Sequence, residues 1–277
     1  MLSKIYSYGQ LLSLDVVLGA ICSALFLSSF LEIVLPYSVL SCLALAVWII
    51  YTADHLIDAY KIRKAATSAR HTFHQRHFTV LITLVILASG ITIYIVVTLI
   101  PPNTRIWGLY LGAIVLVYFG ILVWWKPQSL FFKETMVAAI YTSGIFLGPL
   151  SIMSSSVPTR VWPFIIQFWL LALVNLLEFS LFEQEADRSD NQGSLVLKIG
   201  LRRTRRLIRI CLILLVLSTS PLIFYFWPDI YMIKAQVLIF LMTLALSTLT
   251  IFEEYFEHKQ RYRKLGDGAF IFPILFV

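Results

Sequence analysis

Runs of about 20 apolar residues recur along this chain of 277 residues, and they constrain its fold more than any other feature. About 20 apolar residues form an α-helix long enough to cross the hydrocarbon core of a bilayer. Only helices and closed barrels satisfy their backbone hydrogen bonds in lipid, and barrel strands alternate apolar with polar residues. These runs do not alternate. The sequence therefore predicts an all-α, polytopic integral membrane bundle.

Composition supports this prediction. The chain is 59% hydrophobic and 13% charged, whereas a soluble domain has about a quarter of its residues charged. The first ten residues are short and polar, and the first apolar run is long enough to span, so no cleavable signal peptide is expected. All three cysteines fall within apolar runs, which indicates buried thiols and no disulfide framework.

The apolar runs divide the chain into about nine helices within a single membrane domain, residues 1–277. The ninth contains only the last twelve residues, about 18 Å of helix, against a hydrocarbon core of about 30 Å. It is therefore expected to begin earlier, to span partway or to lie against its neighbours. The predicted spans are 11–31, 35–53, 78–100, 106–125, 134–152, 161–181, 207–226, 231–252 and one from about 266.

The basic residues predict an orientation. If the N-terminus is cytoplasmic, only Arg105, Arg160 and Lys234 of the 22 Lys and Arg residues lie on the outer side. Cytoplasmic loops carry an excess of Lys and Arg, so this arrangement is favoured. The net charge of +7 then reflects topology, and no nucleic-acid partner is expected.

Two inner segments, 54–77 and 183–206, have the same layout. Each follows an even-numbered span, opens with acidic residues and continues with basic ones. Asp54 and Asp58 are four positions apart, and so are Glu183 and Asp187. Each pair therefore shares one face of a helix. Such pairs repel, and acids near a bilayer are costly. Mg²⁺ held by these carboxylates and by substrate phosphates is one compensation, and pairing of solvated helix ends with nearby arginines is the other.

Cationic residues of the same segments are candidates to bind a diphosphate, because Arg and Lys donate to phosphate oxygens. The run "RHTFHQRH" at 70–77 is otherwise a basic segment at headgroup level or a transition-metal site. Glu178 precedes Glu183 and is expected to face the same cavity as a base, or to make an interhelical hydrogen bond. The predicted diphosphate-binding residues are Arg63, Arg70, His71, Arg188 and Lys198.

The second segment resembles a motif of the UbiA superfamily of intramembrane prenyltransferases, D-x-x-x-D-R-x-x-G-x-x-T-L. Glu183 replaces an aspartate and Asn191 replaces the glycine, and the following "VLKIG" also resembles the family. The motif places are taken by Glu183, Asp187, Arg188, Asn191, Ser194 and Leu195.

The first segment is similar to the family's other motif, N-D-x-x-D-x-x-x-D, in either of two registers. In one, Asp54 takes the asparagine place, Asp58 an aspartate place and Ile62 the final aspartate place, with His55 second. In the other, Asp54 and Asp58 form the D-x-x-x-D pair and Ile50 replaces the asparagine. The missing acid implies weaker metal binding, a different substrate or lost activity.

The resemblance implies Mg²⁺-dependent transfer of a prenyl group from an isoprenoid diphosphate to a lipophilic acceptor, typically aromatic, within the membrane. It implies that Asp54, Asp58, Glu183 and Asp187 hold Mg²⁺, and that Asp58 and Asp187 are catalytic. Glu178 is added to the predicted catalytic residues as a base from its position in the sixth span. An isoprenoid cyclase, a non-catalytic isoprenoid-binding relative and a small-molecule transporter are the alternatives. A transporter site usually lies near the membrane midplane, whereas these acids gather at one inner face.

Overall fold

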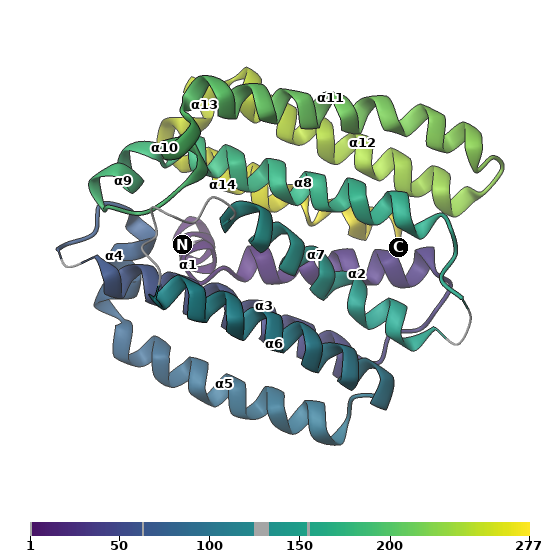
Figure 1. Cartoon of the computed structure of the whole chain (residues 1–277), viewed down its shortest axis with the longest axis horizontal. Helices are drawn as coiled ribbons and strands as arrows, with labels where there is room; N and C mark the ends of the chain where they lie inside the picture. Colours follow the sequence, from purple (N-terminus) through teal and green to yellow (C-terminus); the bar gives the residue numbers. More distant parts are fainter. Residues whose placement is uncertain (1, 63, 125–132, 154–155) are drawn as a thin grey trace.

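The computed structural model describes residues 2–62, 64–124, 133–153 and 156–277. Helices and turns, with no strand, make up this part of the chain. The long helices run side by side along the long axis of the molecule, and several short helices gather at one end (Figure 1). The predicted all-α bundle is therefore confirmed.

Seven of the described helices are long and apolar enough to cross a membrane. The structure therefore supports a multi-pass membrane protein, with fewer full-length spans than the nine predicted. The seven are α3 (Tyr37–Lys61), α5 (Phe78–Thr98), α6 (Pro102–Trp124), α7 (Lys133–Ile152), α8 (Val161–Phe182), α11 (Leu201–Tyr225) and α12 (Ile230–Ile251).

The first and last predicted spans differ from the prediction. Ser13, in the left-handed region at φ 55°, separates α1 (Leu2–Leu11) from α2 (Leu14–Phe30), which is apolar but has only 17 residues. The last segment is α14 (Arg261–Ala269) followed by the 3-10 helix η3 (Phe272–Phe276). Both pack against α2 and α12, which fits the expectation that the ninth segment lies against its neighbours.

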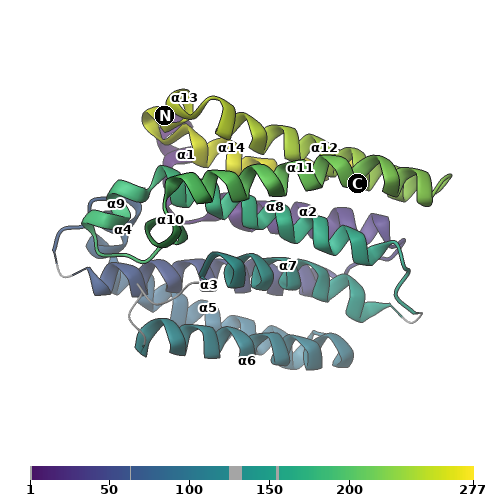
Figure 2. The same ribbon diagram turned by 45° about the horizontal axis from the view of Figure 1, so that its top comes forward.

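The helices form layers around α8. Figure 2 shows α5 and α6 on one side and α11 with α12 on the other, with α3, α7, α2 and α8 between them. In α8, 61% of an 18-residue apolar stretch is buried inside the protein, whereas in α5 the corresponding share is only 11%. Large apolar side chains of α5, such as Ile86 and Ile93, are exposed, as expected of a helix that faces lipid.

The remaining elements are short and lie near one end of the bundle (Figure 1). Ser68 caps α4, because its hydroxyl accepts a hydrogen bond from the His71 backbone N–H at 3.1 Å. Gly200, at φ 83°, separates α10 from α11. These elements are α4 (Ala69–Arg76), α9 (Gln184–Ser189), α10 (Leu195–Ile199), α13 (Glu253–Glu257) and the 3-10 helix η2 (His258–Gln260).

Candidate functional site

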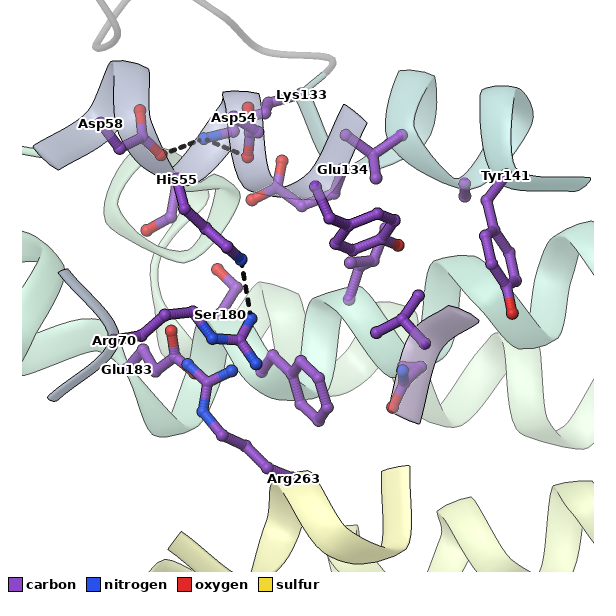
Figure 3. Close-up of a pocket in the computed structure, with 18 of the residues that line it drawn as sticks. Asp54, His55, Asp58, Arg70, Lys133, Glu134, Tyr141, Ser180, Glu183 and Arg263 are labelled. Carbon is purple, nitrogen blue, oxygen red and sulfur yellow. Dashed lines mark hydrogen bonds and ion pairs between the residues drawn. The ribbon is translucent and has the colours of Figure 1, made fainter. Parts of the chain in front are cut away.

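A cavity that is open on one side lies where the two acidic segments meet. Its polar wall comes from α3, α4, α7, α8, α9 and α14, and its apolar wall includes Val16, Ala138, Ala172 and Phe270. Segments more than 200 residues apart in sequence therefore build one site. Figure 3 shows the labelled polar side chains around this space.

The first acidic pair lies on α3, where Asp54 and Asp58 are one turn apart and both line the cavity. Lys133, the first residue of α7, donates a hydrogen bond to Asp58 Oδ2 at 2.9 Å. Its Nζ also lies 3.8 Å from Asp54 Oδ2 (Figure 3). The pair is therefore neutralised in part by a side chain from another helix.

The second acidic pair is divided between two environments. Glu183, which follows α8, forms an ion pair with Arg263 of α14 and accepts a hydrogen bond from the Tyr262 hydroxyl at 3.1 Å. Asp187 on α9 lines the cavity. Burial, and then the nearby Glu183 carboxylate, raise the pKa of Asp187 to about 7. Asp58 contributes to the same rise, so the two predicted acidic pairs interact electrostatically.

The predicted cations Arg70 and His71 both line the cavity from α4. Arg70 is 9% exposed, and its Nη1 lies 3.0 Å from His55 Nε2 (Figure 3). Burial lowers the pKa of His71, which therefore favours the neutral form. His74 Nδ1 is hydrogen-bonded to the Arg70 carbonyl at 2.8 Å, so its ring supports α4.

The other predicted residues lie outside this cavity or outside the described part of the chain. Arg188 and Lys198 line an adjoining hollow, which shares Asp187 and Ser194 with the cavity. Arg63 lies outside the described residues. Glu178 does not line the cavity, because its side chain accepts a hydrogen bond from Thr250 of α12 at 2.8 Å. The structure thus places the predicted base in an interhelical contact.

Four charged residues of the cavity were not predicted as site residues. Lys133 and Glu134 begin α7, and Arg263 and Asp267 lie on α14. Glu134 Oε1 accepts a hydrogen bond from the Leu195 backbone N–H at 2.6 Å, so it also fixes the start of α10. The position of all four residues at the edge of apolar segments could have identified them from the sequence. Charged residues there are costly near lipid unless they have a function or a partner.

The wall of the cavity is rich in acidic side chains. Carboxylates outnumber cationic side chains in the wall by six to three, counting Asp54, Asp58, Glu134, Glu183, Asp187 and Asp267 against Arg70, Lys133 and Arg263. Buried oxygens of Asp54, Glu134 and Asp267 have no hydrogen-bond partner.

The arrangement fits Mg²⁺ only in one binding mode. Among the residues that the structure describes, no group of three or more His, Cys, Asp or Glu is arranged to hold a metal. Mg²⁺ commonly uses one or two carboxylates, several waters and substrate phosphates, and the side of the cavity around Asp187 fits that mode.

Comparison of the chain with family models, with curated proteins and with solved structures gave no match. The proposed function therefore rests on the sequence and on the geometry of the cavity.

Proposed function

We propose that the protein transfers a prenyl group from an isoprenoid diphosphate to a lipophilic, preferably aromatic, acceptor within the membrane, with Mg²⁺ as cofactor. The supporting observation is one cavity lined by both charged and apolar side chains, where both acidic segments and three buried or half-buried cations meet. An isoprenoid diphosphate likewise combines a charged head with an apolar tail.

The cations of the wall bind the diphosphate. Arg70, Lys133 and Arg263 present guanidinium and ammonium donors, which form charge-assisted hydrogen bonds with phosphate oxygens. They stabilise the charge that develops on the leaving oxygen when the bond between carbon and oxygen breaks. Asp187 would hold Mg²⁺ together with phosphate oxygens, and the bound ion would supply Lewis-acid neutralisation of that same charge.

The apolar wall protects the reaction from water. The departing diphosphate takes the bonding electron pair and leaves an allylic carbocation, which water would capture. Val16, Ala138, Ala172 and Phe270 are lining residues that bring no nucleophile, although the Tyr141 ring packs against Phe270 in the same wall. An electron-rich carbon of the acceptor then attacks and loses its proton to a base, which we do not assign to Glu178 because of its position outside the cavity.

We also propose the membrane orientation that the charge bias predicts, with the N-terminus and the acidic segments on the cytoplasmic side. The diphosphate would then enter from the cytoplasm and the acceptor from the lipid.

Binding of isoprenoid without turnover is the second candidate. The ion pair of Glu183 with Arg263 favours it, because that carboxylate is already engaged by a cation. Release of diphosphate from a prenyl donor in the presence of membrane extracts distinguishes the two functions.

The first experiment is binding of a non-hydrolysable geranylgeranyl diphosphate analogue to detergent-purified protein, with and without Mg²⁺. We expect Mg²⁺ to strengthen binding and Asp187→Asn to remove that gain. Glu185→Gln is the matched control, because Glu185 lies exposed on the same short helix and outside the cavity. Absence of Mg²⁺-dependent binding, also with shorter and longer analogues, would refute the proposal.

A further inference from the structure

The side chain of Lys133 occupies the position between the two carboxylates of α3. Its Nζ lies 2.9 Å from Asp58 Oδ2 and 3.8 Å from Asp54 Oδ2. Figure 3 shows this nitrogen between the two carboxyl groups, joined to both by dashed lines. The ammonium therefore stands where a cation shared by the pair would bind.

The surroundings strengthen this assignment. Asp58 is 6% exposed, and the side chain of Lys133 is 22% exposed, so their attraction is only partly screened by water. Removing Lys133 would leave two neighbouring carboxylates without their cation. Such an arrangement is strongly unfavourable in a buried site.

No further acid extends the pair along α3. The next position on the same face, four residues after Asp58, is the buried Ile62, and Lys61 donates instead to the Leu122 carbonyl. Two carboxylates that share an ammonium offer a divalent ion few oxygens. On the other side of the cavity Arg263 engages Glu183, but Asp187 is not one of the carboxylates that Lys133 or Arg263 contacts.

We propose that Lys133 is a built-in cation that replaces a divalent ion at Asp54 and Asp58, so that the cavity takes up one divalent ion, at the Asp187 side. An ammonium has three N–H donors, and the Asp58 carboxylate accepts one of them. The acidic pair of α3 then positions Lys133 so that another donor reaches a phosphate oxygen. This last step rests on the proposed function, whereas the replacement of the divalent ion does not.

The experiment counts bound Mn²⁺ by electron paramagnetic resonance on the full-length protein in detergent, without and with the geranylgeranyl diphosphate analogue. We expect Asp58→Asn as a single substitution to leave the number of bound Mn²⁺ ions unchanged. Lys133→Met adds one bound Mn²⁺, and Asp58→Asn in the Lys133→Met background removes it again. Loss of a Mn²⁺ ion from the wild type on Asp58→Asn, or no gain on Lys133→Met, would overturn the proposal.

Two further variants serve as controls for Lys133→Met. Lys133→Arg retains a cation at this position and is expected to bind the wild-type number of Mn²⁺ ions, even where Lys133→Met folds poorly. Lys264→Met is the matched control, because Lys264 is exposed and lies outside the cavity. If the analogue does not bind, the proposed function fails, but the Mn²⁺ counts measured without it still decide the role of Lys133.

Discussion

Asp190 joins the two acidic segments, and its replacement by alanine tests how strongly they hold each other. Both oxygens of its buried carboxylate lie 3.1 Å from the Thr67 backbone nitrogen, which donates to them. The Thr67 hydroxyl donates to Oδ1 at 2.8 Å. His71 Nδ1 lies 3.8 Å from Oδ2. Asp190→Ala therefore removes the acceptor of two separate donors.

The expected cost follows from these contacts. A hydrogen bond to a charged group contributes about 1.5–3 kcal/mol. Thr67 is exposed, so water replaces part of each lost hydrogen bond. We therefore assign each of the two donors the lower limit of this range, about 1.5 kcal/mol. The estimate is about 3 kcal/mol of unfolding free energy for Asp190→Ala. Thr67→Val keeps the backbone bond but removes the hydroxyl, which bonds to Asp190 and also lies 2.7 Å from Ser189 Oγ, and it should cost about 1 kcal/mol.

Thermal unfolding in detergent measures these costs, and hydrogen exchange of residues 64–68 measures the local opening. We expect Asp190→Ala to accelerate exchange at Thr67. When Thr67→Val is already present, Asp190→Ala should cost about 1.5 kcal/mol instead of about 3, because only the hydrogen bond from the Thr67 backbone nitrogen is then left to lose. Additive costs, or an unchanged exchange rate at Thr67, would refute the reasoning. Glu185→Gln on the adjacent helix serves as the control.

Three other predictions concern the bundle and the site. Gln167 and Gln236 exchange two amide hydrogen bonds at 2.9 and 2.8 Å, so Gln167→Leu should cost about 1–2 kcal/mol in thermal unfolding, and Gln167→Leu with Gln236→Leu should cost less than the single change. Arg263→Met should cost about 3 kcal/mol, because it leaves the largely buried Glu183 unpaired; a double variant with Glu183→Gln that is no more stable would contradict this. The raised pKa of Asp187, about 7 against the ordinary 3.8, means that the folded protein without metal or diphosphate binds an extra proton between these values. Its unfolding free energy should therefore fall as the pH rises through that range, and Asp187→Asn should flatten this slope in thermal unfolding measured at several pH values.

Long apolar runs predict where the spanning helices lie, but a change in polarity does not always mark a helix end. The predicted span 35–53 stops before α3 ends at Lys61, and the predicted span 207–226 starts after α11 begins at Leu201, because polar residues continue both helices. The predicted spans 134–152 and 161–181 correspond to α7 and α8 within one residue at each end. The first span was predicted too long, since the left-handed Ser13 interrupts it and no proline or glycine marks that break.

The site was predictable in part. Acids at helix ends identified Asp54, Asp58, Glu183 and Asp187, and the structure brings all four to one cavity. Their partners were not predictable, because ion pairs between distant helices leave no local pattern. Nothing around Lys133 in sequence indicates that it reaches Asp58, 75 residues earlier. Arg263 was likewise counted only as an inner positive charge, although it pairs with Glu183.

The ion pair between Glu183 and Arg263 cannot form until α14 has been synthesised, long after α8. The ribosome makes Glu183 about 80 residues before Arg263, which at about 5–20 residues per second is roughly 4–16 s. Over that interval α8 is already made, while the cation that neutralises the acid at its end is still missing. The nascent chain must therefore keep Glu183 in contact with water or headgroups, and the cavity wall closes only when α14 docks.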